Sequence, residues 1–553
     1  MRIQGHRKEG NVGIPLLLPL RPLCFPLLFV FGFLGFEKVL DLWQPFEPKD
    51  PYGISRQILS AEGVLLQLLP NSLGERRMVL PSSGFSKALK QAVIAGEDHN
   101  FYKHSGIDPW ALGRAVFSNL WAGRRVSGAS TISMQVCRLL EPRPRTLHSK
   151  LLEFFRTRQL ERIWTKERIL TYYLNSAPLG GTLRGFEAAS LFWFGVHAKD
   201  LDPAQAATLA ALLPAPSARS PKRNPKKLLA ARNRILFRMT AQGMLQRQEL
   251  EFFLRRTLGT RVHPWPFRAP HAVFWFLRHM RGEHLQTSLR WWMQQRVQKL
   301  MKGHDPGPGL GLAVLVLDRK KGDVLAMAGS PDWKRTQVNA LFSPRCVGST
   351  LKPFLYALAL DLGVGSPVQA LPDQPSHFAN WNPKNFDRKF FSWVGFSEAL
   401  RSSRNLPAIT LLQRVGTARF RDLLVQLGLK VPEDQLLGLD AALGTLSLTP
   451  FQLAQAYRIF GDAQQRLTPS PASRQAILRI LKRPKMPGLL LHPEVAWKTG
   501  TSSGRRDAWS IGLTKHYVIL VWMGSLIGAG SPLCVGGGVT TDLLFDLASF
   551  FEA

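Results

Sequence analysis

The sequence predicts a multidomain chain with an N-terminal membrane anchor, a mainly α-helical domain and an α/β (α+β) domain in which an antiparallel sheet lies between helices. Three observations predict this fold class. An apolar region covers residues 12–36, helical periodicity dominates residues 85–245, and strand-like segments stand at both ends of residues 309–553. With 553 residues, the chain is long enough for two or three domains that each bury their own core.

The N-terminal segment has the features of an uncleaved signal anchor. Arg2, Arg7 and Lys8 precede the apolar region, which only Arg21 interrupts. Basic residues stay on the cytoplasmic side of a membrane, and no small-residue cleavage site follows the apolar region. We therefore expect residues 1–44 to form a cytoplasmic tail and a transmembrane segment, with the rest of the chain outside the cytoplasm.

The remaining chain divides where its residue pattern changes. Patchy alternation in residues 45–80 predicts a stalk and a small hairpin, and residues 81–250 predict the helical domain, in which Thr165 can cap a helix. Residues 251–308 are typical of a helical linker. It ends where the Pro- and Gly-rich segment His304-Asp305-Pro306-Gly307-Pro308-Gly309 interrupts the helical pattern. The second domain then covers residues 309–553.

Strand signals define the second domain. Five segments predict strands: 312–317, 323–328, 497–502, 508–514 and 517–523. The first two flank the turn Lys320-Lys321-Gly322 and predict a β-hairpin, and a helix over residues 541–551 completes the domain. Strands at both ends with helices between them are typical of one antiparallel sheet covered by helices.

The chain is strongly basic, with 72 Lys and Arg against 38 Asp and Glu and a formal net charge of +34. Such a charge favours polyanions, and anionic lipid, pyrophosphate substrates and nucleic acid are the candidates. The sequence has no zinc-finger spacing or basic-region heptads, which argues against nucleic acid. His99 and His104 do not have the spacing of a zinc site, so we predict no metal there and a structural capping role for Asp98 and His104.

Ser349-Thr350-Leu351-Lys352 is a candidate catalytic motif. A serine three residues before a lysine lies on the same helix face, where the amine can reach the hydroxyl. Serine is a weak nucleophile that needs a neighbouring base, and burial or nearby cations can lower the pKa of a lysine enough for it to act as one. Taken alone, the spacing is more typical of a surface helix with an exposed serine and lysine.

Two later motifs favour the catalytic interpretation. Ser403-Arg404-Asn405 offers a second hydroxyl and an amide, and Lys498-Thr499-Gly500-Thr501 lies in a predicted strand. In this order, the three motifs resemble those of the penicillin-recognising serine acyltransferases.

That resemblance implies an acyl-enzyme mechanism. Ser349 would attack the carbonyl of a stem peptide that ends in D-Ala-D-Ala, with Lys352 as its base, and β-lactams would acylate the same serine. Ser403 would relay a proton to the leaving amine, Asn405 would hold the peptide, and Lys498 would complete the polar network. The implied substrate-binding residues are Thr499, Gly500 and Thr501. The backbone N–H groups of Ser349 and Thr501 would form the oxyanion hole.

The helical domain carries a second candidate site. Glu97 ends an apolar helix, where burial can raise the pKa of a carboxyl group to that of a useful base. Residues 128–135 supply small side chains and hydroxyls that could hold phosphate oxygens. Lys150 and Glu153 lie three residues apart on a helix. They form a surface ion pair, or Glu153 is a second carboxylate of the site and lies beside cations that bind an anionic leaving group.

These residues belong to motifs that resemble the peptidoglycan glycosyltransferases of family 51. The motifs are Glu97-Asp98-x-x-Phe101-x-x-His104-x-Gly106, Gly128-Ala129-Ser130-Thr131-Ile132-x-x-Gln135, Lys150-x-x-Glu153 and Lys166-x-x-Ile169-Leu170-x-x-Tyr173-Leu174-Asn175. With the acyltransferase motifs behind them, the chain resembles a class A, bifunctional penicillin-binding protein over roughly residues 50–550. Three further segments are similar to the 1C subgroup of that family: residues 140–146, Ala177-Pro178 and Arg506-Asp507-Ala508-Trp509.

The resemblance implies a lysozyme-like glycosyltransferase domain that polymerises lipid II. Glu97 would deprotonate the acceptor sugar hydroxyl, and Glu153, with Lys150, would stabilise the departing lipid pyrophosphate. The implied donor-site residues are Ser130, Thr131 and Gln135. A divalent cation, magnesium or manganese, is a further candidate at this site. The expected partners are lipid II, nascent glycan strands, the inner membrane, which the apolar stripe of residues 112–121 would enter, and other wall-synthesis proteins.

Four positions depart from the family pattern. Thr182, Leu179, Ser149 and Arg404 stand where asparagine, tyrosine, arginine and leucine are common. These departures leave an alternative open, namely a membrane-bound penicillin-binding scaffold or sensor in which one or both sites are inactive. A β-lactamase is the least favoured interpretation, because the sequence offers no identifiable base for deacylation.

Overall fold

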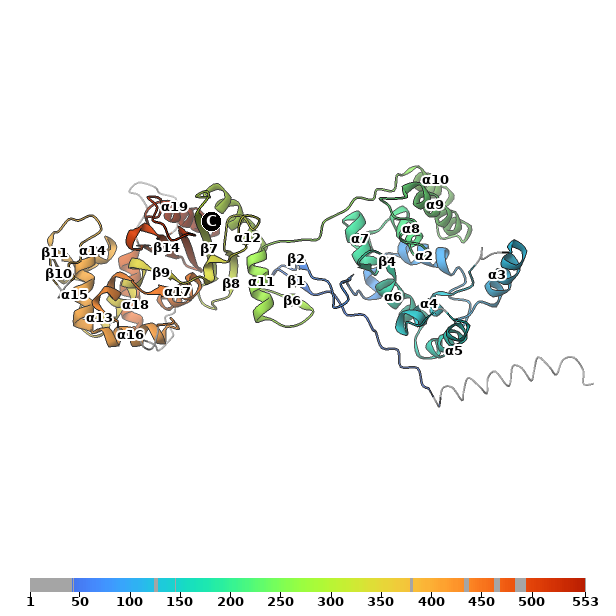
Figure 1. Ribbon diagram of the computed structural model, residues 1–553, viewed down its shortest axis with the longest axis horizontal. Coiled ribbons are helices and arrows are strands. Elements are labelled where there is room, and N and C mark those ends of the chain that lie inside the picture. The colour runs from blue at the N-terminus through green and yellow to red at the C-terminus, as the bar shows by residue number, and fades with distance from the viewer. Residues whose placement is uncertain are drawn as a thin grey trace, which may run out of the picture. The chain divides into compact units, whose positions relative to one another are not determined.

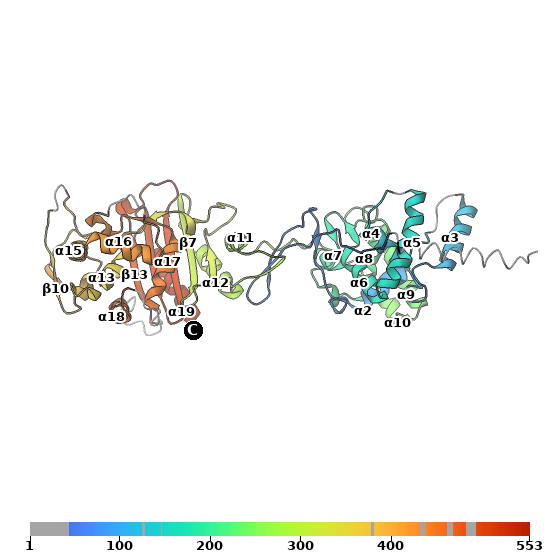
Figure 2. The same ribbon diagram turned by 90° about the horizontal axis from the view of Figure 1, so that it is seen from below.

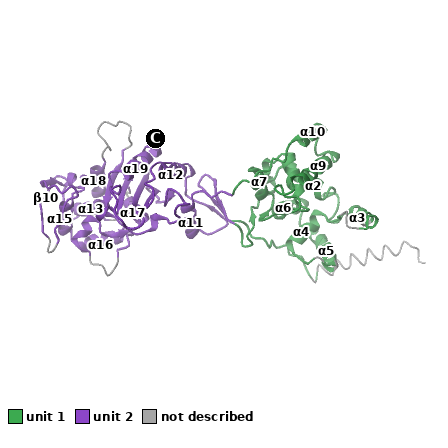
Figure 3. Ribbon diagram, turned by 45° about the horizontal axis from the view of Figure 1, so that its top comes forward, with its two compact units in different colours: residues 1–55, 70–264 green, residues 56–69, 265–553 purple. Residues whose placement is uncertain are grey.

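The computed structural model describes residues 42, 44–123, 128–144, 146–377, 381–431, 437–461, 468–482 and 494–552. The chain divides into two compact units (Figure 3): unit 1 contains residues 1–55 and 70–264, and unit 2 contains residues 56–69 and 265–553. The predicted anchor, residues 1–44, lies outside the described residues except for positions 42 and 44. Within the described ranges, no helix combines the length and the apolar character needed to cross a bilayer.

Unit 1 is mainly helical, as the sequence predicts (Figure 1). Its elements are β3 (Arg76–Arg77), α2 (Lys87–Glu97), α3 (Pro109–Ala122), α4 (Ile132–Leu140), α5 (Leu147–Ile163), α6 (Lys166–Ser176), β4 (Pro178–Gly180), β5 (Leu183–Arg184), α7 (Phe186–Phe194), α8 (Pro203–Leu212), α9 (Pro225–Ala241) and α10 (Arg247–Arg255). Helices α2, α8 and α9 pack on one another, and α4 packs against both α5 and α6.

Hydroxyl caps set where several of these helices begin. The side chains of Ser86, Thr131 and Thr165 accept hydrogen bonds from the backbone N–H groups of the first turns of α2, α4 and α6. A cap of this kind satisfies an N–H group that has no partner within the helix. The predicted cap at Thr165 is confirmed.

Unit 2 contains the central sheet. Its elements are β1 (Gln57–Leu59), β2 (Leu65–Leu68), α11 (Pro270–His279), β6 (His284–Gln286), α12 (Trp291–Gly303), β7 (Leu310–Asp318), β8 (Val324–Ala328), β9 (Arg345–Cys346), η4 (Gly348–Leu351), α13 (Lys352–Asp361), β10 (Ala370–Asp373), β11 (Ser392–Gly395), α14 (Phe396–Arg401), α15 (Asn405–Val415), α16 (Thr417–Gln426), β12 (Ser447–Leu448), α17 (Pro450–Tyr457), α18 (Pro471–Leu481), β13 (Ala496–Thr501), β14 (Asp507–Leu513), β15 (Tyr517–Ser525) and α19 (Val539–Glu552).

The five strands that the sequence predicts form a single antiparallel sheet with the order β13-β14-β15-β7-β8. Along β7, Leu312, Val314 and Val316 face the cluster that contains α12 and α19, whereas the alternate residues face the larger core with α13 and α17. This period of two is what a sheet buried on both faces requires. Figure 2 shows the sheet with its helices.

A smaller sheet joins segments that precede and follow residues 70–264 of unit 1. Strands β1 and β2 form the predicted antiparallel hairpin, and β6 adds to β1 in parallel. Residues 251–308, which the sequence analysis describes as a helical linker, divide between the units: α10 belongs to unit 1, and α11, β6 and α12 belong to unit 2. Pairing between β1 and β6 is a contact across more than 200 residues, which local patterns do not reveal.

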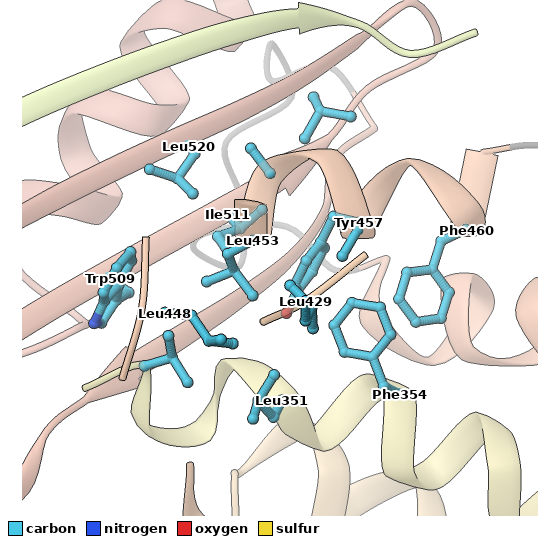
Figure 4. Packing of buried hydrophobic residues seen from close by; sticks show 14 of the residues in the cluster. Leu351, Phe354, Leu429, Leu448, Leu453, Tyr457, Phe460, Trp509, Ile511 and Leu520 are labelled. Atoms are coloured by element: carbon cyan, nitrogen blue, oxygen red, sulfur yellow. The ribbon is translucent and has the colours of Figure 1, made fainter. Parts of the chain in front are cut away.

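The start of α13 rests on a packed apolar core. Phe354 lies beside Tyr457 and Phe460, and Leu351 belongs to the same cluster (Figure 4). The rings of Phe354 and Tyr457 meet edge to face at 5.1 Å. The Tyr457 hydroxyl donates to the Thr350 carbonyl at 2.5 Å. Interiors packed in this way resist displacement, so the turn before α13 is held in one position.

Two candidate active sites

Ser349 lies in the 3₁₀ turn η4, directly before α13, and is half-buried. The motif spacing predicts a helix face for this serine, but the α-helix begins only at Lys352. Close approach of β13 explains why a glycine precedes Ser349 in this turn. Gly348 has φ +54°, and a Cβ there would lie 2.6 Å from the Thr501 carbonyl oxygen, so the chain passes β13 where only glycine fits.

Lys352 is completely buried beneath this turn. Its Nζ donates to the carbonyl oxygens of Ser403 (2.7 Å) and Arg404 (3.1 Å) and to Asn405 Oδ1 (2.8 Å). Burial, followed by the charges of Lys498 and Arg404, holds the pKa of Lys352 well below its usual value. The described structure contains no hydrogen bond between Lys352 Nζ and Ser349 Oγ. The contact between amine and hydroxyl that the sequence predicts is therefore not formed in this state.

Residue 403 stands between two lysines. Lys352 bonds to its carbonyl oxygen, and the buried Lys498 donates from Nζ to its hydroxyl at 2.7 Å and to the Thr499 carbonyl at 2.8 Å. Ser403 has φ +59°, a conformation that costs a non-glycine residue about 1–2 kcal/mol. The contacts on both of its sides hold it there. The three motifs of the sequence therefore meet at one place in unit 2.

Strand β13 forms the opposite wall. A Cβ at Gly500 would lie 2.7 Å from both the Thr350 side chain and the Val347 carbonyl, so the strand runs closely along η4. Thr499 and Thr501 are half-buried, and the Thr501 hydroxyl accepts a hydrogen bond from the Gly536 N–H at 3.0 Å. The predicted substrate-binding residues of this site thus line one side of the turn that carries Ser349.

Glu97 is the last residue of α2 in unit 1. Although the residue is only half-buried, burial of its carboxyl group raises its pKa above the ordinary value, against the lowering effects of Gln135, Arg219 and Arg238. Gln135 Nε2 donates to Glu97 Oε2 at 2.9 Å, and the Tyr173 hydroxyl donates to Gln135 Oε1 at 2.9 Å. The carboxylate is therefore oriented by a chain of two hydrogen bonds.

Glu153, on α5, has the opposite electrostatic environment. Its carboxylate accepts hydrogen bonds from Arg138 (2.9 and 3.1 Å) and from Lys150 (2.8 Å). Burial alone would raise the pKa of Glu153, but the hydrogen bonds and charges of Arg138 and Lys150 lower it overall. Glu153 is therefore held ionised, whereas the surroundings of Glu97 favour proton uptake.

Helix α4 connects the two carboxylates. Gln135, which holds Glu97, and Arg138, which holds Glu153, lie three residues apart and so on one helix face. A cavity of about 350 Å³ opens beside this face. Its lining includes Ser130, Arg138, Lys150 and Glu153, but not Glu97. Sequence reasoning did not single out Arg138; its position one turn after Gln135 was the available signal.

The predicted donor-site residues differ in what their side chains do. Ser130 lines the cavity, and its hydroxyl accepts from Lys150 Nζ at 3.2 Å. The buried Thr131 hydroxyl caps α4 and donates to the Gly106 carbonyl at 2.6 Å, so the fold itself occupies it. Gln135 is occupied between Glu97 and Tyr173. Of the three predicted residues, Ser130 is the one in the cavity.

Asp98 and His104 have the structural role that the sequence predicts. The Asp98 carboxylate accepts from His104 Nε2 at 3.0 Å and from the backbone N–H of Ile132 at 3.0 Å. These bonds tie the segment after α2 to the first turn of α4. They bring Gln135 within reach of Glu97.

The residues around Glu153 do not fit a divalent cation held by the protein. Both of its carboxylate oxygens already face cationic side chains, from Arg138 and Lys150. Magnesium and manganese require several oxygen ligands, and the described residues contain no cluster of three or more His, Cys, Asp or Glu suited to a metal. We therefore derive no catalytic step through a metal ion.

Comparison with known proteins assigns both units. Residues 63–240 match the transglycosylase family, and residues 312–502 match the penicillin binding protein transpeptidase domain. Penicillin-binding protein 1C of Escherichia coli (strain K12) is 35% identical over 526 residues, which cover 90% of this chain and 68% of that protein. Penicillin-binding protein 1F of Bacillus subtilis (strain 168) is 28% identical, with 81% of this chain and 71% of that protein covered.

Solved structures agree on the fold. The crystal structure of penicillin-binding protein 1A from Haemophilus influenzae superposes with a TM-score of 0.57 at 16% identity, over 90% of this chain and 92% of that one. At this identity the match concerns the fold alone. It indicates the same combination of a helical domain and a sheet-containing domain.

Proposed function

This chain belongs to the class A penicillin-binding proteins, bifunctional enzymes of peptidoglycan synthesis, and from that premise we propose how its residues carry out the two reactions. Unit 1 polymerises lipid II into glycan strands, and unit 2 cross-links stem peptides that end in D-Ala-D-Ala. The observation that supports this most directly is that each unit gathers its own polar site from residues far apart in the sequence. The scaffold or sensor alternative needs one site to be incomplete, whereas the proposed catalytic residues of both sites are all present in the described part of the chain.

In unit 1, Glu97 is the general base. It takes the proton of the acceptor sugar hydroxyl, whose oxygen attacks the anomeric carbon of the donor; a glycosidic C–O bond forms and the bond to pyrophosphate breaks. A base with a raised pKa suits this step, because proton transfer is most efficient when the pKa of the base lies near the working pH. The bond from Gln135 aims the carboxylate.

The leaving pyrophosphate is received beside Glu153. Lys150 and Arg138 supply positive charge in the cavity, and Ser130 supplies a hydroxyl at its edge. Glu153 keeps these two cations in fixed positions, which prepares the site for the charge that develops on the leaving oxygen. A lysozyme-like arrangement of the domain is part of this proposal.

In unit 2, the neutral amine of Lys352 removes the proton of Ser349, and Ser349 Oγ attacks the carbonyl of the penultimate D-Ala. Nζ faces three acceptors in residues 403–405, so the neutral amine must release one of them before its lone pair can face Ser349 Oγ. The lowered pKa of Lys352 supports this role. The backbone N–H groups of Ser349 and Thr501 stabilise the oxyanion.

The C–N bond to the terminal D-Ala breaks, its amine takes a proton from Ser403, and Lys498, which donates to the Ser403 hydroxyl, replaces that proton. Asn405 and Thr499 hold the peptide, and Thr501 binds its terminal carboxylate, with Gly500 leaving room for close approach. The amine of a second stem peptide then attacks the ester and forms the cross-link. β-Lactams acylate Ser349 in the same way as the peptide.

The chain acts at the inner membrane, with residues 1–44 as a single-pass anchor and both units on the outer side. Exposed apolar side chains on α3, Trp110, Phe117, Leu120 and Trp121, support membrane contact by unit 1. The net charge of +34 favours an anionic lipid substrate. Other wall-synthesis proteins are further partners under this proposal, and nucleic acid is not.

Replacing Gln135 with leucine should move the acid limb of the polymerisation rate to higher pH. Glu97 acts as the carboxylate, so polymerisation falls as the pH drops through its pKa, which burial already raises. Loss of the Gln135 N–H removes a donor that stabilises the carboxylate, so the pKa rises further. Rates measured across pH give the shift, with penicillin labelling as the unaffected control. An unshifted acid limb would contradict the assignment of Glu97.

A lipid II assay that resolves glycan length and cross-links tests the whole proposal. The full chain should produce cross-linked strands, and penicillin should remove the cross-links while long strands remain. Strands without cross-links in the untreated sample would overturn the role of unit 2. Absence of strands would overturn the role of unit 1.

A further inference from the structure

Arg404 is the middle residue of the Ser403-Arg404-Asn405 motif, where the family commonly has leucine. Its side chain is only 5% exposed, and it pairs with Asp373, which is 0% exposed. Charged groups are rarely buried this deeply unless they are paired, and a charge left alone by loss of its partner is strongly unfavourable. The pair is therefore a feature that the fold must maintain directly after Ser403.

Arg404 contacts Asp373 and the segment 384–391 at four residues. Its Nε and Nη2 donate to Asp373 Oδ2 at 3.0 and 2.7 Å, and its Nη1 donates to Asp387 Oδ2 at 2.8 Å. Nη2 also donates to the Lys389 carbonyl oxygen, and the guanidinium lies 4.6 Å from the ring centroid of Phe391. A planar group with five N–H donors can bind all these partners at once, which neither lysine nor leucine can do.

The same segment orients Asn405. Asn385 Oδ1 accepts from the Asn405 backbone N–H at 2.8 Å, and the Lys384 carbonyl accepts from Asn405 Nδ2 at 2.8 Å. Asn385 is held in turn, because its Nδ2 donates to Asp373 Oδ1 at 2.7 Å. Asp373 thus bonds to Arg404 through one oxygen and supports Asn405, through Asn385, with the other.

The orientation of the Asn405 amide matters for Lys352. Its Oδ1 accepts from Lys352 Nζ at 2.8 Å only because its NH₂ group points to the Lys384 carbonyl. An amide turned by half a rotation would present N–H donors to the lysine, which also has only donors when charged. Direct hydrogen bonds therefore run from Arg404 through Asp373, Asn385 and Asn405 to the proposed base.

We propose that Arg404 is a positioning residue for acylation, which with Asp373 fixes the segment 384–391 and so aims the Asn405 amide at Lys352. The inference rests on the proposed function of unit 2. The segment also contacts the opposite side of the site, where Arg505, just after β13, lies 5.9 Å from the ring centroid of Phe386. Arg404 thus orders the segment 384–391, which contacts both the Ser403-Arg404-Asn405 motif and the residues that follow β13.

The test compares acylation rates of the full chain with a fluorescent penicillin between pH 5 and about 10. The variants are Arg404→Met, Asp373→Asn and the double variant. The matched control is Arg335→Met, since Arg335 forms a two-bond ion pair with Asp305 (2.7 and 2.8 Å) elsewhere in the same unit. Glycan polymerisation by unit 1 and thermal unfolding report the integrity of each preparation.

Arg404→Met and Asp373→Asn should each slow acylation about 10- to 100-fold at the plateau of the pH profile, because a misplacement of about 1 Å in a catalytic group has an effect of that size. The double variant should lose no more than the worse single variant, because the two residues act as one unit. Arg335→Met should stay within about twofold of the parent, as surface ion pairs contribute little.

Three results would overturn the inference: an Arg404→Met rate within about twofold of the parent, multiplicative losses in the double variant, or a shifted acid limb with an unchanged plateau. The third result would mean that Arg404 acts only through its charge, as Lys498 also does, on the pKa of Lys352. A parent chain that is not labelled at Ser349 would instead overturn the proposed function itself.

If Arg404→Met fails to fold, Arg404→Lys replaces it. A lysine keeps the charge beside Asp373 but cannot reach Asp387 and the Lys389 carbonyl at the same time. The expected result is a folded unit 2 with slowed acylation and an unshifted acid limb. Acylation at the parent rate in this variant would overturn the inference.

Discussion

Replacing Ser349 with alanine is expected to abolish covalent labelling by penicillin while glycan polymerisation continues. In the proposed mechanism the Ser349 oxygen forms the acyl bond. The two described neighbours that could replace it are engaged: Lys352 is buried among acceptors, and Ser403 is bonded to Lys498. In another acyl-transfer enzyme, removal of the serine nucleophile lowers kcat by about 10⁶-fold. Labelling followed on a denaturing gel measures the loss, which should reach background.

Ser402→Ala is the matched control for this experiment. Ser402 is an exposed neighbour of the Ser403 motif that follows the last residue of α14, and its hydroxyl donates to the Glu398 carbonyl of that helix. This variant should be labelled at the parent rate. Labelling that persists in Ser349→Ala would show that another residue forms the acyl-enzyme. Loss of polymerisation in that variant would show that the two units do not act independently.

Replacing Glu97 with glutamine is expected to stop lipid II polymerisation while penicillin labelling persists. Glutamine has nearly the same shape and still accepts the hydrogen bond from Gln135, but it cannot take a proton from the acceptor hydroxyl. General base catalysis typically contributes about 10²- to 10⁴-fold, so the rate should fall by that factor. Strand formation from lipid II over time measures it.

Glu167→Gln is the control in unit 1. Glu167 is half-exposed and forms an ion pair with Lys90 at 2.8 Å, outside the cavity beside Glu153. Its loss should leave polymerisation within about twofold, as for other surface ion pairs. An unchanged polymer yield in Glu97→Gln would refute the assignment of the base and would direct attention to Glu153.

Much of the arrangement could be predicted because its signals are local. The five sheet strands alternate between two buried faces, and the terminal helix has an apolar stripe, so both appear in the residue pattern. The three motifs of unit 2 were predicted to act together from their order, and they do meet around residue 403. The small hairpin was also predicted, but its third strand, β6, was not. The pairing of β1 with β6 depends on where the chain lies after residues 70–264, which local patterns do not show.

Other features could not be predicted because they depend on contacts distant in sequence. Ser349 lies in a 3₁₀ turn next to Gly348, where β13 approaches too closely for any side chain. The residues around position 348 give no sign that β13 lies there. Thr131 was assigned to substrate binding, yet its hydroxyl is used by Gly106 and the first turn of α4. Arg404 was noticed only as a departure, since its counterion, Asp373, is 31 residues away.

The motifs were enough to predict the family and the two chemistries and to point to the proposed nucleophile and bases, because the reactive side chains are confined to short motifs with fixed spacing. Only the tertiary structure decided their electrostatic states. The pKa of Lys352 falls because other segments bury it beside Lys498, and that of Glu97 rises because its carboxyl group is buried at the end of α2. Desolvation and charge act through space, so they are set by the neighbours that folding supplies and not by the neighbours in the chain.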